Sequence, residues 1–330
     1  MTLLSLVSLL VACKDETVKT DPTDTGVVDT ADTSDSTDTS APCEVEVVSV
    51  SVDDGETDVY YRDTFVVSFS GDGQAAGASL SLTDAAGAGV PADVTWSEGN
   101  VQASVSAVLD ATATYTLTAS VCGADTTRSF TTSTLGTPMT MEAGDLVGRT
   151  YVFRMSESTI TQPPFLNALR SQLSVPILIG VTQADASTVT LLGGLGELRN
   201  DGTYRQYLGE PTWDFPAADF TENPYFEAQS ARIVLAYAGA DIPVENFTLS
   251  GTFTSDGGTL AEAIVTGLGD TRNMGALVSQ PDNPGAVCGF AEAAGVPCEP
   301  CADGEPYCLF IVAEQIDATY VDGVTVVPVE

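Results

Sequence analysis

Apolar and polar residues alternate with a period of two along most of the chain after residue 43. Because successive side chains of a strand point to opposite faces, this alternation predicts half-buried β-strands separated by turns rich in Gly and Asp. In the first part of this region the pattern predicts seven short strands, at 45–52, 64–70, 79–83, 92–97, 101–108, 114–121 and 127–132. Seven short strands in about 90 residues favour an immunoglobulin-like sandwich at 43–136.

The region 144–330 is also mostly β by the same pattern. It predicts eight strands, at 149–155, 175–183, 187–195, 231–238, 246–254, 258–267, 307–314 and 318–327, and short helices at 164–173 and 271–278. Asp256-Gly257 predicts a hairpin turn, and the glycines of Gly193-Gly194-Leu195-Gly196 predict a bulge or turn. The predicted fold is therefore all-β: an Ig-like β-sandwich followed by a larger β-sandwich or up-and-down barrel with a disulfide-stapled loop.

The first twelve residues lack this alternation and are almost wholly apolar or small. The run is too short to span a membrane but suits the apolar part of a signal peptide. No Lys or Arg precedes Cys13, so we expect the start codon to lie upstream of Met1. Leu10-Val11-Ala12-Cys13 resembles the lipobox of bacterial lipoproteins. The resemblance implies that residues 1–12 are cleaved as a lipoprotein signal peptide and that Cys13 is lipidated.

Residues 13–42 form an acidic segment after this leader. It carries eight carboxylates, two lysines and no aromatic residue, in repeated Asp-Thr pairs. Such a composition cannot bury enough apolar surface to offset chain entropy, so a disordered, extended tether is predicted. Diffuse cation binding is the alternative, but the glycine turn and terminal Glu of a dedicated calcium loop are missing.

Charge and composition exclude several functions. The chain has 46 acidic and 11 basic residues, no His and a net charge of -35; without the tether the balance is 38 acids against nine arginines, or -29. This charge repels nucleic acids. The absence of His removes Ser-His-Asp chemistry and His-ligated zinc. We therefore expect no enzyme activity, no catalytic residue, no cofactor and no metal.

Six cysteines remain if Cys13 is lipidated, and an exported protein folds in an oxidising compartment. Cys43 with Cys122 would pin the first strand to the sandwich. The other four allow three connectivities, of which Cys288 with Cys298 and Cys301 with Cys308 is favoured because each closes a short loop. The single CxxC, Cys298-Glu299-Pro300-Cys301, could also be a redox motif, but structural disulfides are the preferred interpretation.

The start of the first domain carries a family resemblance. Residues 49–59 (SVSVDDGETDV), followed by Asp63-Thr64 and residues 66–70 (VVSFS), resemble the start of the SbsA-like bacterial Ig-like family. Residues 114–117 and 129–132 are similar to that family's later strands. The resemblance covers this domain alone and implies a structural spacer or adhesive module without catalytic residues.

Residues 204–226 are unusually aromatic and interleaved with carboxylates. Pro211, Pro216 and Pro224 predict an irregular loop. Aromatic faces beside carboxylates could stack on sugar rings or hold a cationic ligand; the alternative is that they fold the loop back onto the domain. The candidate ligand-binding residues are Tyr204, Tyr207, Trp213, Phe215 and Tyr225. A carboxylate hydrolase using Glu210 and Glu222 is the one enzyme class that this composition allows readily.

Together these patterns predict a non-enzymatic, envelope-anchored lipoprotein, structural or adhesive, whose Ig-like spacer presents the distal domain. Small-ligand or glycan binding by residues 204–226 is the main alternative. Lys14, rather than Asp, follows the cysteine, which favours the outer membrane of a Gram-negative bacterium, in either its periplasmic or its outward-facing leaflet. The expected partners are the membrane, through the lipid anchor, and an envelope protein or glycan.

Overall fold

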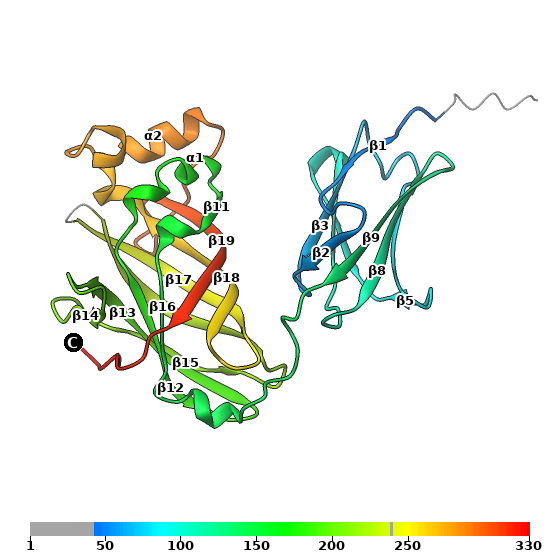
Figure 1. Ribbon diagram of the computed structural model, residues 1–330. Coiled ribbons are helices and arrows are strands. Elements are labelled where there is room, and N and C mark those ends of the chain that lie inside the picture. Colours follow the sequence, from blue (N-terminus) through cyan, green and yellow to red (C-terminus); the bar gives the residue numbers. More distant parts are fainter. Residues whose placement is uncertain (1–42, 238–239) are drawn as a thin grey trace, which may run out of the picture. The chain divides into compact units, whose positions relative to one another are not determined.

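The computed structural model describes residues 43–237 and 240–330, and these residues fold almost entirely into β-strands (Figure 1). The predicted all-β class is confirmed. Residues Cys43–Glu330 form one compact unit with two separate apolar cores, which we call the Ig-like domain and the distal domain. The predicted signal peptide, Cys13 and the acidic tether lie outside the described residues.

Two sheets make up the Ig-like domain. One has the strand order β1-β3-β7-β6 and the other β2-β9-β8-β4-β5. Each predicted strand overlaps a strand of the structure. Neither β2 nor β5 was predicted, because runs of four and two residues show no clear alternation. The strands are β1 (Val47–Val50), β2 (Glu56–Val59), β3 (Thr64–Phe69), β4 (Ser79–Asp84), β5 (Gly89–Val90), β6 (Asp93–Trp96), β7 (Gln102–Ser106), β8 (Thr114–Val121) and β9 (Ala124–Thr132).

Alternation in sequence becomes alternation in burial within this domain. Along β8, Tyr115, Leu117, Ala119 and Val121 are buried, while the residues between them are partly exposed. The inward faces of both sheets form the core, where Phe65 and Phe130 contact each other with ring centroids 4.7 Å apart. Burial of this apolar face is what holds the two sheets together.

The distal domain is built on one ten-stranded sheet that curls around its own core. Its strand order is β14-β13-β12-β10-β19-β18-β17-β16, with β11 added on β19 and β15 on β13. All the pairings are antiparallel. The strands are β10 (Thr150–Phe153), β11 (Thr159–Gln162), β12 (Ile177–Ala184), β13 (Thr188–Leu198), β14 (Tyr204–Gln206), β15 (Trp213–Asp219), β16 (Tyr225–Tyr237), β17 (Ala240–Phe253), β18 (Thr259–Asp270) and β19 (Cys308–Tyr320).

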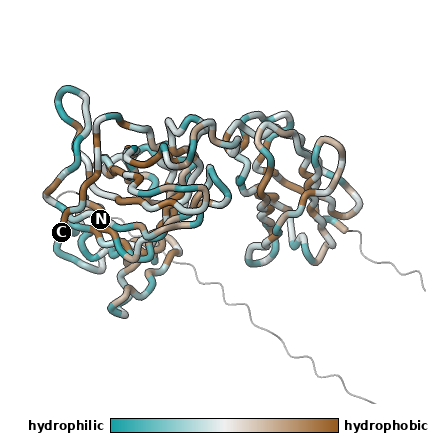
Figure 2. Tube along the Cα trace, turned by 90° about the horizontal axis from the view of Figure 1, so that it is seen from below, coloured by the Kyte–Doolittle hydropathy of each residue, from teal (hydrophilic) through white to brown (hydrophobic). Residues whose placement is uncertain are grey.

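Short helical segments lie between these strands. The two α-helices, α1 and α2, lie at the same end of the distal sheet (Figure 1), where Phe165 and Phe290 contact each other edge to face at 5.2 Å. In Figure 2 hydrophobic stretches follow the strands and hydrophilic ones follow many of the turns. The segments are η2 (Ala143–Leu146), η3 (Met155–Glu157), α1 (Pro164–Asn167), η4 (Arg170–Gln172), η5 (Thr271–Asn273), η6 (Gly275–Val278) and α2 (Ala286–Ala293).

The two ends of the distal core differ. Phe226 is the second residue of β16 and Phe253 is the last residue of β17, so the antiparallel pairing of these strands brings both to the same end. There the Phe253 ring stacks on Phe226 at 5.2 Å and contacts Tyr151 and Phe220, and all four side chains are at most 1 % exposed. Aromatic rings thus fill the end of the core opposite α1 and α2.

Three predictions for the distal domain were wrong in detail, and one helix was not predicted. The predicted strand 318–327 is the end of β19, and the chain after Tyr320 has no strand. The helix expected at 271–278 is two 3₁₀ turns, η5 and η6. Helix α2 was missed, and Gly193–Gly196 lies inside β13 rather than in a turn. The Asp256-Gly257 hairpin is confirmed: it joins β17 to β18, and Gly257 has a φ of +64°.

Pro216 was predicted to prevent regular structure, yet it lies in β15. Among the described residues β15 pairs with β13 alone, and the register shifts between Val189 and Leu191, opposite Pro216. An edge strand with a bulge tolerates proline because its missing N–H is not needed by a second neighbour. The position of β15 at the edge of the sheet therefore allows a strand where the local sequence disfavours one.

No helix among the described residues is long and apolar enough to cross a membrane.

The Cys43–Cys122 disulfide links the start of the Ig-like domain to the end of β8 across 79 residues of sequence. Closing a loop of that length removes chain entropy from the unfolded state, which corresponds to about 4 kcal/mol in the loop-entropy model. We expect Cys43→Ser with Cys122→Ser to lower the unfolding free energy by up to that amount, measured by guanidinium denaturation. Ser79→Ala with Ser81→Ala, on the exposed surface, is the control. Equal stability of the two double variants would contradict the prediction.

Candidate functional site

The candidate ligand-binding residues of segment 204–226 do not meet at one place. The segment folds as β14, β15 and the start of β16, rather than as a long loop. Trp213 and Phe215 are 4 % and 0 % exposed and belong to the distal core. Tyr207 is 40 % exposed, and Tyr204 and Tyr225 are half-buried.

Trp213 and Phe215 owe their positions to a glycine. Both lie on the same face of β15, which pairs with β13, and Trp213 is opposite Gly193. A methyl group built on Gly193 would lie 2.7 Å from Trp213 Cε3 and 3.0 Å from Phe215 Cε2. Glycine in a strand often marks such a close approach, but the sequence pattern at this position was interpreted as a bulge or turn. The two rings are therefore packing elements of the core.

Tyr204 and Tyr225 contact different arginines. The Tyr204 hydroxyl accepts a hydrogen bond from the Arg154 guanidinium at 2.5 Å. The guanidinium of Arg62 lies 3.8 Å from the centroid of the Tyr225 ring and forms an ion pair with Glu222. Glu222, one of the two carboxylates considered for a hydrolase, is thus held in a salt bridge.

All six described cysteines are paired in the favoured way. Besides Cys43–Cys122, disulfides join Cys288 to Cys298 and Cys301 to Cys308. Cys288 lies in α2 and Cys308 begins β19, so the two bridges tie the segment between α2 and β19 to itself at both ends. Arg272 adds ion pairs to Asp270 and Asp303 at 2.6 Å each. The chain around α2 is therefore firmly attached to the distal sheet.

The environment of Glu262 disfavours the charged form of its carboxyl group. It lies in β18 with a left-handed backbone, φ +48°, and its N–H donates to Asp317 Oδ1 at 3.3 Å. Burial raises the pKa of Glu262 above its ordinary value, and the nearby charges of Asp317 and Asp63 raise it further. Burial likewise raises the pKa of Glu314. Among the described residues no cluster of three potential ligands could hold a metal ion.

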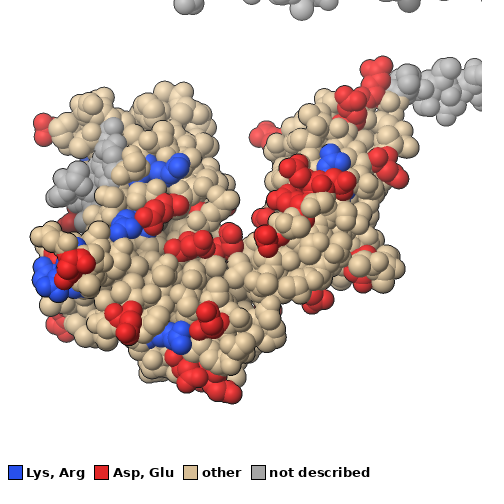
Figure 3. Space-filling view, in the orientation of Figure 1, with Lys and Arg blue, Asp and Glu red and all other residues tan. Residues whose placement is uncertain are grey.

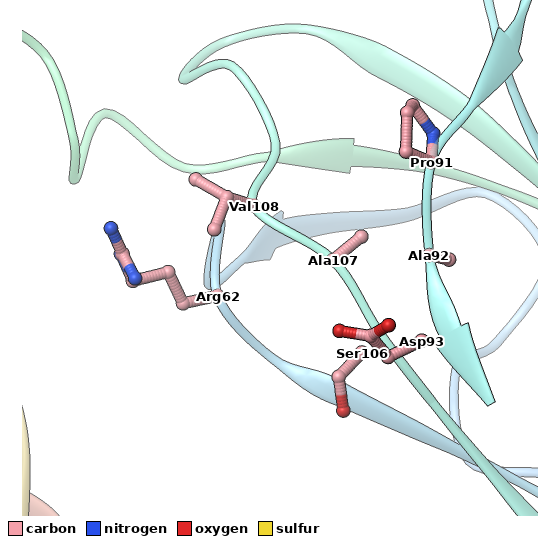
Figure 4. A pocket seen from close by; sticks show the side chains of 7 residues that line it. All are labelled: Arg62, Pro91, Ala92, Asp93, Ser106, Ala107 and Val108. Carbon is pink, nitrogen blue, oxygen red and sulfur yellow. The ribbon is translucent and has the colours of Figure 1, made fainter. Parts of the chain in front are cut away.

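Two surface recesses are open and have both polar and apolar walls. One, of about 360 Å³, lies on the Ig-like domain and is lined by Arg62, Asp93, Ser106 and small apolar residues (Figure 4). Arg62 lies in the turn between β2 and β3 and Asp93 at the start of β6, and the recess has no aromatic wall. Acidic side chains are spread over the face shown in Figure 3, with few basic ones among them. These recesses offer little that would hold a specific ligand.

The most distinctive site is a partly open, apolar cavity of about 50 Å³ within the distal domain, which we call the apolar chamber. One wall comes from the short segments after β10. Met155 of η3, Ile160 of β11, Leu166 of α1 and the two leucines that flank η4, Leu169 and Leu173, supply it.

The other wall of the apolar chamber belongs to the curled sheet. Leu235 lies near the end of β16, Ile242 and Val244 near the start of β17, and Ile311 near the start of β19; Met274 follows β18. These positions are the strand ends opposite the aromatic cluster of Phe253. The chamber therefore lies at the end of the core covered by α1, η3 and η4.

A second space, of about 20 Å³, adjoins the chamber. It shares Met155, Leu173 and Leu235 with the first space and extends to Ile177 of β12 and Leu195 of β13. Every lining side chain of both spaces is apolar. Water needs two to four polar partners, so the chamber is dry. An empty cavity of this size costs on the order of 1 kcal/mol of folding free energy.

No family model matches the chain, and no curated protein matches it. Among solved structures it is similar to an L,D-transpeptidase from Mycobacterium smegmatis, with 16% identity, 62% of this chain and 76% of that chain covered, and a TM-score of 0.23. It is also similar to the S-layer protein rSbsC(31-844), with 10% identity, 86% of this chain and 54% of that chain covered, and a TM-score of 0.21. The match thus spans about half of the S-layer protein. At these TM-scores neither likeness carries an argument about fold or function.

Trp213→Ala should reduce the unfolding free energy by about 3–5 kcal/mol, because it empties a large volume beside Gly193. Tyr207→Ala, at an exposed position, should change it by less than about 0.5 kcal/mol. Urea denaturation of residues 43–330 measures both values. A well-folded Trp213→Ala variant of unchanged stability would show that Trp213 is not a packing residue.

Glu262→Gln should stabilise the protein at pH 7. Because the pKa of Glu262 is raised in the folded state, its charge destabilises the fold above that pKa, and the penalty disappears as pH falls below the unfolded value near 4.5. The gain in Tm should therefore be largest at pH 7 and vanish near pH 4. Glu227→Gln, on the exposed face of β16, serves as control. A gain that is independent of pH would contradict the assignment.

Proposed function

We propose that this chain is a non-enzymatic, lipid-anchored protein of the bacterial envelope, in which an Ig-like spacer presents the distal β domain. The lipobox-like Leu10-Val11-Ala12-Cys13, followed by the acidic tether, is the observation that carries the proposal. In it, Cys13 bears acyl chains that hold the protein at the outer membrane. The role of the body is structural or adhesive.

Two features of the folded unit support an extracytoplasmic location. All six cysteines of the unit are in disulfides, and such bonds persist in oxidising compartments. The absence of His, together with the engagement of Glu222 by Arg62, gives a carboxylate hydrolase no support. The SbsA-like resemblance of the first domain fits a spacer and is part of the proposal.

Ligand or glycan binding by residues 204–226 is less well supported. Of the five candidates, Tyr207 is the one that is well exposed, and Trp213 and Phe215 are already used in the core. A sugar-stacking platform needs free ring faces side by side, and these residues do not provide them.

Lipidation is tested in a Gram-negative host that expresses the chain with its upstream sequence and is fed an alkyne-bearing fatty acid. The wild-type protein should take up the label and partition into the detergent phase of Triton X-114. Cys13→Ser should lose both properties, because more than one acyl chain is needed for stable anchoring. Thr17→Ser, in the tether, should retain both. Label that persists in Cys13→Ser, or a wild-type protein that remains unlabelled, would overturn the proposal.

A further inference from the structure

We propose that the apolar chamber of the distal domain is a binding site for one linear alkyl chain, such as that of an alkanol or of a lipid. The sequence pattern favoured a different ligand-binding site, the aromatic segment 204–226. The inference does not depend on the lipidation of Cys13, since the chamber lies wholly within the distal domain.

The walls determine the chemical class of the ligand. Each lining side chain is aliphatic or a methionine, and no hydrogen-bond donor or acceptor side chain lines either space. A sugar, an ion or a peptide would lose its hydration there without compensation. A saturated hydrocarbon loses nothing by leaving water and gains contacts with every wall.

The shape of the chamber favours an elongated ligand. The two spaces share Met155, Leu173 and Leu235, so together they run from the start of β17 towards β12 and β13. No aromatic ring lines either space, in contrast to the opposite end of the core, which is packed with the rings around Phe253. A flat ring system does not match the shape of these two spaces, whereas a flexible alkyl chain can pass from one to the other along their aliphatic side chains.

The chamber can enlarge without disturbing the sheet. Met155 and Met274 lie on its wall, and methionine is unbranched and adapts to irregular spaces. The wall formed by α1, η3 and η4 consists of segments of three or four residues, which make few hydrogen bonds to neighbouring strands. The α2 segment is fixed by two disulfides, and so is a firm support beside the movable wall. A space of about 50 Å³ is too small for a long alkyl chain, so the proposal requires this wall to move outward when the chain binds.

The first test uses residues 43–330, the compact unit, produced in oxidising conditions. Displacement of the linear fluorescent polyene cis-parinaric acid by 1-alkanols of 6 to 14 carbons measures affinity. Each added CH₂ should strengthen binding about fourfold until the chamber is full, after which the affinity should level off. Absence of saturable binding, or affinity that keeps rising over the whole series as in surface adsorption, would overturn the proposal.

A variant locates the site. Leu173→Phe adds bulk to the wall that both spaces share, and should weaken dodecanol binding at least tenfold. Leu208→Phe makes the same change at a side chain that is 62 % exposed, and should bind like the wild type. Thermal melting checks that both fold. If Leu173→Phe does not fold, the chain-length series on the wild-type protein still decides the question; equal binding by two folded variants would overturn the proposed location.

The full-length acylated protein distinguishes two sources of alkyl chain. If it binds dodecanol as the 43–330 unit does, the natural ligand is a separate lipid. In the other outcome, the 43–330 unit and full-length Cys13→Ser bind dodecanol but the acylated protein does not. The acyl chain on Cys13 then occupies the chamber. Both results support an alkyl-chain site.

Discussion

Filling the inside of a curled antiparallel sheet is the physical constraint on which the distal domain depends. Every second side chain of the sheet points inward, and burial of these side chains provides the main stabilisation of the fold. At one end the space is filled by the rings around Phe253. At the other end it is bounded by aliphatic side chains and by the short segments α1, η3 and η4. The domain is therefore tightly packed at one end and adaptable at the other.

This difference explains why the aromatic segment is structural. Trp213 and Phe215 project from an edge strand onto the bare backbone of Gly193, where two large rings can lie close to a neighbouring strand. Carboxylates between them face water, as alternation requires. A segment that looks like a binding loop by composition is thus a strand that completes the core, and the candidate site lies in a region of unremarkable Leu, Ile, Val and Met.

Disulfides and charged side chains also affect the stability of the protein. The Cys288–Cys298 and Cys301–Cys308 bridges hold the segment around α2, where few strand hydrogen bonds are available. The body carries a large excess of acidic over basic residues, and burial raises the pKa of Glu262, so this carboxylate is charged at a cost to stability. These features fit a protein selected to persist outside the cell's reducing interior, which is part of the proposed function.

The sequence by itself determined the all-β class, most strand positions and the favoured cysteine pairs, because alternation and short loop closure are local properties. It did not reveal that Pro216 lies in a strand, that Gly193 lies under Trp213 or that α2 exists, since these depend on which strand becomes an edge and which backbone a ring meets. The apolar chamber is the clearest case. Its walls come from residues between Met155 and Ile311, and only the folding of the sheet decides that their side chains surround one space and do not fill it.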